Sequence, residues 1–352
     1  MKIHAFFAKA FFLVLSLCPI ATLSASSWQP LSPPTSPIAR GSACLAVDPT
    51  SNRLILFGGM NWSLLRRADT WETRLRDEEW HAAWLDDTWE WDGMRWTRLN
   101  PDTHPFSRSG ACLSPDPTGH LLLFGGNHRG PLGDTWRWDG TTWSSLALET
   151  GPCSRMNGCM AFDPIANRVI LFGGDTVPAL LNDTWEWDGI LWSQRTPEVS
   201  PPCRFGSCMA FDPISQVLIL FGGLGWRPDP TDADATIPFD DTWQWDGTTW
   251  TQLMPPVSPP ARSLAQLAVN PATNRLILFG GWDGSKVLSD TWEWDGTTWS
   301  PLSPRTTPPA RYGACLAPDP SSNRLILFGG EKPSTEDLCD TWELVHDNAT
   351  VP

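Results

Sequence analysis

The sequence predicts an all-β protein in which one four-stranded unit recurs six times. Three observations predict this. Phe-Gly-Gly recurs with a base period of about 49 residues, and Asp-Thr-Trp follows each copy. The last copy lacks a final strand that the segment after the N-terminus can supply. A unit of this size cannot bury both faces of its own sheet, so the copies must stack against one another.

The repeated signature has four parts, which are clearest in the segment from Asn274 to Trp299. An apolar run ends in Phe-Gly-Gly, with Phe at 57, 124, 172, 221, 279 and 328. Asp-Thr-Trp follows, with Asp at 87, 134, 183, 241, 290 and 340. Five copies continue into Trp-Asp-Gly and reach one more Trp, at 96, 143, 192, 250 and 299. Each part therefore holds a fixed place in the unit.

Local chemistry predicts the four strands. Leu-Ile-Leu-Phe is short, apolar and ended by glycine, as expected of a buried second strand. In Trp-Glu-Trp the two rings are two residues apart and share one face of a third strand. Asp-Gly is a hairpin turn signal that leads into the fourth strand. A first strand, such as Gly313 to Ala317, ends at an Asp-Pro or Asn-Pro turn ahead of each apolar run.

These residues resemble the kelch repeat, with Trp in place of the Tyr that is often found at the family's first aromatic position. The resemblance covers Trp28 to about Val345 and implies a six-bladed β-propeller with one blade per repeat. The segment Ser26 to Pro33 is similar to Thr297 to Pro304, so we expect Trp28 to supply the missing fourth strand of the last blade. Such closure removes free sheet edges.

The chain divides into a leader and one propeller. Residues 1–26 read as a secretory signal peptide, with Lys2 and Lys9 near a short apolar core, which predicts a secreted or extracytoplasmic protein. A lipid anchor at Cys18 is the alternative, which the bulky Leu17 disfavours. Residues 27–352 form the propeller, with insertions at 60–86 and 224–240. Trp80 and Trp84 have helical spacing in the first insertion, and the Pro- and Asp-rich second insertion is expected to be a loop.

Charge limits the partners. The formal net charge is −14, and only two lysines, Lys286 and Lys332, follow the leader, so nucleic acid and anionic membranes are poor candidates. No later apolar run is long enough for a membrane helix. We expect the protein to be a monomer.

Strand direction predicts where ligands bind. The start of the first strand, the loop between the second and third strands and the connection between blades should share one face. An arginine recurs there in every repeat, as Arg40, Arg108, Arg155, Arg204, Arg262 and Arg311. A ring of six arginines would suit a carboxylate, an acidic sugar or an acidic peptide. The alternative is that each arginine pairs with an Asp of a neighbouring turn or stacks on a Trp.

Residues that differ between blades are the other binding candidates. His128, Trp226 and Trp282 are predicted to stand on the same face, together with Asn127, Arg129, Asp175, Asp283, Glu331 and Lys332. The Asp of Asp-Thr-Trp is shared by all blades and reads as a structural turn cap.

No metal or cofactor site is predicted. Neither the histidines nor the cysteines have metal-ligand spacing, and the acidic run from Asp229 to Asp241 lacks an EF-hand pattern. Five cysteines hold one repeat position and read as buried packing residues. Cys153 could pair with Cys159, or Cys203 with Cys208, in an oxidising compartment. Sequence does not determine that connectivity.

Three functions follow as hypotheses. The first is a secreted binding or interaction module for a protein or a carbohydrate, and no catalytic group is identified. The second is an extracellular carbohydrate-active enzyme, since kelch propellers resemble the galactose oxidase central domain and the sialate mutarotases. Copper oxidase chemistry is excluded because that family needs several Tyr ligands and this chain has only Tyr312. The third is a structural domain of a surface assembly.

Overall fold

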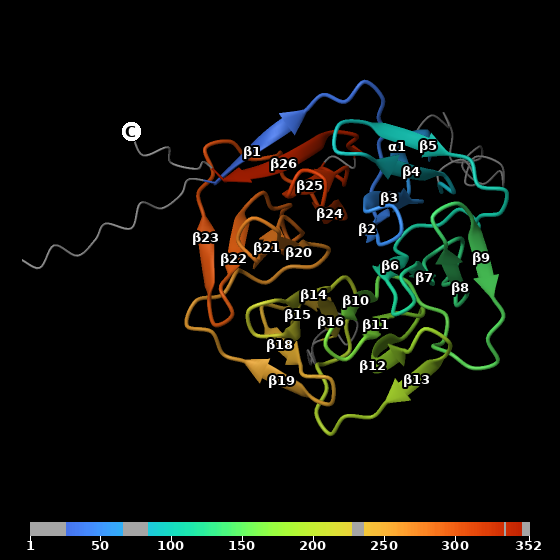
Figure 1. Cartoon of the computed structure of the whole chain (residues 1–352). Helices are drawn as coiled ribbons and strands as arrows, with labels where there is room; N and C mark the ends of the chain where they lie inside the picture. Colours follow the sequence, from blue (N-terminus) through green and yellow to red (C-terminus); the bar gives the residue numbers. More distant parts are fainter. Residues whose placement is uncertain (1–25, 66–83, 227–235, 334–335, 347–352) are drawn as a thin grey trace, which may run out of the picture.

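Six four-stranded antiparallel sheets surround a central channel in the computed structural model, which describes residues 26–65, 84–226, 236–333 and 336–346 (Figure 1). The chain is therefore a six-bladed β-propeller, as the sequence predicts. The predicted signal peptide lies almost wholly outside the described residues. Of Trp80 and Trp84, whose spacing predicts a helix in the first insertion, Trp80 lies outside the described residues. Trp84 forms a β-bridge with Met60.

Each of the first three blades consists of four consecutive strands, the first next to the channel and the fourth on the outside. Blade 1 comprises β2 (Cys44–Asp48), β3 (Arg53–Phe57), β4 (Thr88–Trp91) and β5 (Trp96–Leu99). Blade 2 comprises β6 (Cys112–Pro115), β7 (Leu121–Phe124), β8 (Thr135–Trp138) and β9 (Trp143–Leu146). Blade 3 comprises β10 (Cys159–Asp163), β11 (Arg168–Asp175), β12 (Leu180–Trp187) and β13 (Trp192–Arg195).

The other three blades have the same order of four strands from the channel outward. Blade 4 comprises β14 (Cys208–Asp212), β15 (Val217–Phe221), β18 (Thr242–Trp245) and β19 (Trp250–Leu253). Blade 5 comprises β20 (Gln266–Asn270), β21 (Arg275–Phe279), β22 (Thr291–Trp294) and β23 (Trp299–Leu302). Blade 6 comprises β24 (Cys315–Asp319), β25 (Arg324–Phe328), β26 (Thr341–His346) and β1 (Ser26–Leu31). Two elements lie outside these sheets: helix α1 (Trp62–Leu65), between β3 and β4 of blade 1, and a hairpin of β16 (Leu224–Trp226) with β17 (Thr236–Pro238), between β15 and β18 of blade 4.

The N-terminal strand closes the ring, as the sequence predicts. Strand β1 pairs antiparallel with β26, with Trp28 opposite Leu344, and so becomes the fourth strand of blade 6 (Figure 1). Trp28 is fully buried, and its ring centroid lies 5.3 Å from that of Phe279 in blade 5. The two ends of the described chain therefore meet in one sheet.

The core lies between blades. The Leu-Ile-Leu-Phe runs of the second strands are at most 1% exposed, because each sheet packs on both neighbours. The tryptophan of each fourth strand donates its indole N–H to the threonine of Asp-Thr-Trp in the preceding blade, at 2.9–3.2 Å. The donors are Trp28, Trp96, Trp143, Trp192, Trp250 and Trp299. This contact repeats around the whole ring.

The second insertion differs from its prediction. We expected a loop over 224–240, but β16 and β17 pair at its two ends, with Trp226 opposite Thr236. Phe239 follows β17 and its ring lies 4.3 Å from the guanidinium carbon of Arg204. Alternation of apolar and polar residues over three positions is too short a signal to predict such a hairpin.

Candidate binding face

One end of the propeller, here called the loop face, carries the loops between second and third strands. Six isolated β-bridges join each of these loops to the connection that enters the first strand of the same blade. The paired positions are Gly41 with Met60, Ser109 with Asn127, Met156 with Asp175, Phe205 with Leu224, Ser263 with Trp282, and Tyr312 with Glu331. The bridges place these positions together, as the strand-direction argument predicts.

The six repeated arginines lie at this end but do not form an exposed positive ring. Each side chain is at most 1% exposed. Nη1 and Nη2 donate to the two carboxylate oxygens of the Asp of Asp-Thr-Trp in the same blade, at 2.6–2.9 Å. The pairs are Arg40–Asp87, Arg108–Asp134, Arg155–Asp183, Arg204–Asp241, Arg262–Asp290 and Arg311–Asp340. The interpretation in which each arginine pairs with an Asp therefore describes their geometry.

These arginines also join neighbouring blades. Arg108 uses Nη1 to reach the carbonyl oxygen of Gly125 at 2.9 Å, inside its own blade. Its backbone N–H donates to the Leu85 carbonyl of blade 1 at 3.0 Å, and its carbonyl accepts from Gly59 N–H at 2.8 Å. The same arrangement recurs in all six blades. We therefore assign the arginine–aspartate pairs, here called the clamps, to the scaffold.

The role of the clamp aspartates corrects the predicted turn cap. Asp87 binds Arg40 and also accepts the indole N–H of Trp89 at 2.7 Å. Burial would raise the pKa of Asp87, but the hydrogen bonds and charge of Arg40, with the Trp89 hydrogen bond, hold it below its ordinary value. The same balance lowers the pKa values of Asp134, Asp290 and Asp340.

The lowered pKa values predict acid unfolding. A carboxyl whose pKa is lower in the folded state contributes stability that is fully present above its unfolded pKa. That contribution is lost as pH falls through the folded value, here below the ordinary 3.8. We expect the urea midpoint, followed by Trp fluorescence, to fall steeply between about pH 4 and about pH 2. A constant midpoint over that interval would contradict the clamp interpretation.

The three blade-specific candidates lie on three blades. Trp282 is half-buried in blade 5, where its backbone bridges Ser263 and Val287. Trp226 is half-buried in β16 of blade 4. Gly284, two residues after Trp282, packs against Pro238 of β17, where an added Cβ would lie 3.4 Å from the proline ring. The loops that carry the two tryptophans are therefore in contact.

His128 lies in blade 2, beside the end of the first insertion. Its ring centroid is 5.3 Å from that of Trp84, and Nδ1 lies 2.8 Å from the Ser107 carbonyl oxygen. Trp84, Met60 and Trp62 form a small apolar cluster of their own. The structure thus joins His128 to the tryptophans of blade 1, whereas Trp226 and Trp282 belong to neighbouring blades 4 and 5.

A channel with a volume of about 360 Å³ runs between the six first strands. Its entrance residues on the loop face form a closed ring, in which each backbone N–H donates to the carbonyl of the preceding blade at 2.7–3.0 Å. The ring consists of Ser42, Gly110, Asn157, Gly206, Leu264 and Gly313. All six have positive φ, from 52° to 64°. Sequence reasoning missed this ring, for which the only local signal is glycine in three of the six repeats.

The repeated cysteines line the same channel. Cys44, Cys112, Cys159, Cys208 and Cys315 are buried, as the packing interpretation predicts, and burial raises the pKa of the Cys112, Cys208 and Cys315 thiols to about 12. All eight cysteines of the described residues are free thiols, so neither candidate disulfide is formed. Thiols with pKa values this high are poor nucleophiles at neutral pH.

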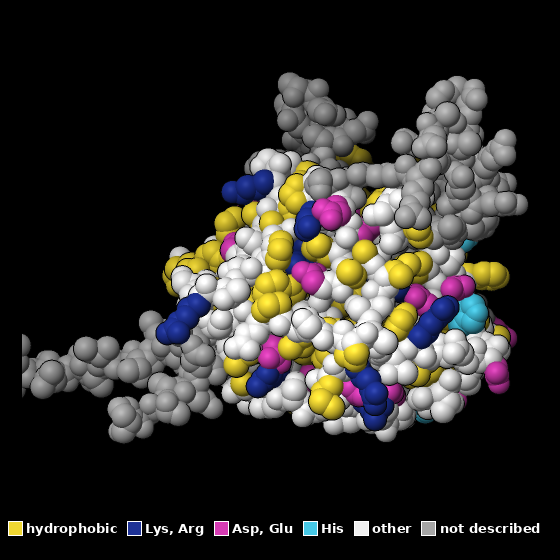
Figure 2. All heavy atoms as spheres, turned by 90° about the horizontal axis from the view of Figure 1, so that it is seen from above, with side chains coloured by type: hydrophobic (Ala, Val, Ile, Leu, Met, Phe, Trp, Pro, Cys, Tyr) yellow, Lys and Arg dark blue, Asp and Glu magenta, His cyan; other side chains and the backbone are white. Residues whose placement is uncertain are grey.

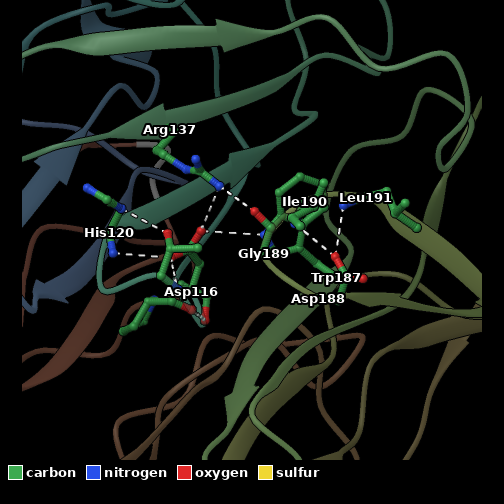
Figure 3. Close-up of polar contacts among 11 residues, drawn as sticks. Asp116, His120, Arg137, Trp187, Asp188, Gly189, Ile190 and Leu191 are labelled. Carbon is green, nitrogen blue, oxygen red and sulfur yellow. Dashed lines mark hydrogen bonds and ion pairs between the residues drawn. The ribbon is translucent and has the colours of Figure 1, made fainter.

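The opposite face holds turns of neighbouring blades together (Figure 3). In blade 2, Arg137 lies between the Asp116 carboxylate, at 3.3 Å, and the Gly189 carbonyl of blade 3, at 2.7 Å. The Trp187 indole also points toward Asp116, at 3.4 Å. Blades 1, 3, 5 and 6 carry a glutamate at the Arg137 position, and it pairs with an arginine of the second strand. The contacts of Arg137 and Trp187 thus join blades 2 and 3, whereas each glutamate–arginine pair lies within one blade.

Charged side chains are scattered over the side wall of the propeller. Figure 2 shows several places where a basic side chain lies next to an acidic one, on a surface that is otherwise mostly uncharged. Within the described part of the chain, no group of three or more His, Cys, Asp or Glu is placed to hold a metal ion. No helix among the described residues is long and apolar enough to cross a membrane.

Comparison with known proteins adds no family to this geometry. No protein-family model matches the chain, and no curated protein matches its sequence.

Proposed function

We propose that this protein is a secreted kelch-type propeller that acts as a binding module through its loop face. The observation that supports the proposal is that the repeated residues hold the blades together, whereas the blade-specific residues stand on the loop face. The repeated Arg, Asp, Thr and Trp side chains form hydrogen bonds and ion pairs within and between blades. The side chains that differ between blades stand on the loop face, where Trp226 and Trp282 are only half-buried.

The chemistry of that face favours a carbohydrate. A half-exposed aromatic ring, such as that of Trp226 or Trp282, can stack on the apolar face of a sugar while polar groups around it bind the sugar hydroxyls. The arginines give no support to an acidic ligand, because their guanidinium groups are buried against aspartates. A neutral saccharide therefore fits the described side chains better than an acidic one. The extracytoplasmic location rests on the leader sequence.

A saccharide panel tests the proposal. A ligand that binds only the folded state increases the free energy of unfolding by mass action, by about 2.7 kcal/mol at a ligand concentration of 100 Kd, and so raises the thermal midpoint. We expect a shift with a neutral oligosaccharide that is lost in Trp282→Ala. The matched control is Ile190→Ala, which removes a 75% exposed side chain from the turn between β12 and β13 on the opposite face.

Two outcomes would count against the proposal. A shift that survives both Trp282→Ala and Trp226→Ala would place the binding site away from the loop face. If no neutral or acidic saccharide shifted the thermal midpoint, a carbohydrate ligand would be ruled out and a protein would remain as the ligand of this face.

A further inference from the structure

A buried glutamate lies where blade 6 meets blade 1 on the loop face. Glu331 follows the Gly-Gly pair of blade 6 and is 5% exposed. Its Oε2 accepts the phenol O–H of Tyr312 at 2.7 Å, and the Trp62 side chain of α1 also donates to it. Gly41 of blade 1 packs against the carboxyl so closely that an added Cβ would lie 2.3 Å from Oε1. The carboxyl is thus enclosed by residues of both blades.

A second carboxyl from the same loop contacts the same helix. Asp337 is 6% exposed, and its Oδ2 accepts the backbone N–H of Ser63 at 3.2 Å. Glu331 and Asp337 are joined by a β-bridge, so they approach α1 together. These contacts between the blade 6 loop and the start of α1 are here called the seam.

The cations nearest to Glu331 along the chain and across the seam have other partners. Arg40 is held by Asp87, and Arg311 by Asp340. Lys332 pairs with Glu336 at 3.2 Å. Among the described residues, no Lys, Arg or His forms an ion pair with Glu331. Within the part of the chain that the structure describes, the groups that stabilise its charge are therefore the Tyr312 and Trp62 hydrogen-bond donors.

This arrangement opposes ionisation. Burial, reinforced by the charge of Asp337, raises the pKa of Glu331 above its ordinary value, although the hydrogen bonds from Tyr312 and Trp62 act in the opposite direction. Burial and the neighbouring Glu331 likewise raise the pKa of Tyr312, so this phenol stays protonated and can only donate to the carboxylate. Of this hydrogen-bonded pair, the carboxyl is therefore the member that changes charge as pH falls from neutral.

We propose that Glu331 makes the seam between blades 6 and 1 pH-sensitive, so that the contact tightens when this carboxyl gains a proton and loosens when it ionises. The sign follows from linkage. A carboxyl whose folded pKa is raised contributes stability that is present below its unfolded pKa and lost as pH rises through the folded one. The effect is therefore opposite in sign to that of the clamps, and it occurs at higher pH.

Deuterium uptake at the seam tests the proposal. We would compare wild type with Glu331→Gln, which mimics the protonated carboxyl, in peptides covering residues 60–65 and corrected for the intrinsic pH dependence of exchange. We expect slower uptake in Glu331→Gln at about pH 7.5 and equal uptake at about pH 4.5. Each unit by which the pKa is raised corresponds to about a tenfold change in the opening equilibrium.

The control is Glu336→Gln, which neutralises a 61% exposed carboxyl of the same loop and should not alter the pH dependence.

Tyr312→Phe provides an independent variant, because loss of its O–H removes a hydrogen bond to the ionised form. Because this hydrogen bond stabilises the carboxylate in the closed seam, we expect Tyr312→Phe to take up deuterium faster than wild type at about pH 7.5 and to differ less from it at about pH 4.5. Equal uptake of wild type and Glu331→Gln at both pH values, or faster uptake in Glu331→Gln at neutral pH, would overturn the proposal.

Discussion

Replacing Trp28 with alanine is expected to lower the free energy of unfolding by about 3–5 kcal/mol, the range for removing a large buried aromatic side chain. Trp28 is fully buried and packs on Phe279 of blade 5. Its indole N–H donates to Thr291 at 3.1 Å, which the substitution leaves without that donor. Since β1 is the strand that closes blade 6, the loss weakens the joint between the two ends of the ring.

Urea unfolding at neutral pH measures this loss. The matched control is Gln29→Ala, because Gln29 is the next residue of β1 and its side chain is exposed. Exposed substitutions of this kind usually change stability by no more than about 0.5 kcal/mol. Indistinguishable midpoints for Trp28→Ala and Gln29→Ala would mean that β1 does not close the ring in solution.

Removing one clamp carboxylate is expected to cost about as much. Asp87→Ala leaves the fully buried guanidinium of Arg40 without its ion partner, and breaking a buried pair in this way typically costs about 3–5 kcal/mol. Arg40 also anchors blade 1 to blade 6, since its backbone N–H donates to the Leu338 carbonyl and its own carbonyl accepts from Gly330. The substitution therefore disturbs the same joint from the loop face.

The chain offers a control three residues away. Glu90 pairs with Arg53, whose side chain is 46% exposed, so water screens this interaction. Glu90→Ala should cost less than about 1 kcal/mol, the range for exposed ion pairs. If Asp87→Ala and Glu90→Ala lowered the free energy of unfolding equally, the clamps would contribute no more to stability than an exposed ion pair.

Sequence alone determined the architecture, because the information lies in local patterns that repeat. Leu-Ile-Leu-Phe before Gly-Gly predicts a buried strand wherever it occurs, and Asp-Gly predicts the turn to the fourth strand. Gly296 shows the φ of 97° that such a turn requires. The similarity between Trp28 and Trp299, with their flanking residues, predicted closure of the last blade without any three-dimensional information.

The candidate site was only partly predictable. Strand direction placed the arginines, Trp226 and Trp282 at one end of the propeller. It did not decide whether a guanidinium at that end reaches solvent or the Asp of Asp-Thr-Trp, since Arg40 and Asp87 are far apart in the sequence. The helical spacing of Trp80 and Trp84 and the loop expected over 224–240 were weaker signals, drawn from one copy each.

Tertiary structure alone decided which groups meet across blades. The ring from Ser42 to Gly313, the clamp of Arg40 with Asp87 and the seam of Glu331 with Tyr312 and Trp62 each need a definite twist of the sheets and spacing of the blades. A pattern within one repeat specifies strands and turns because these depend on neighbouring residues. The exposure, ion-pair partners and pKa of a side chain depend on residues that packing brings close to it. A local sequence pattern does not show which distant residues these are.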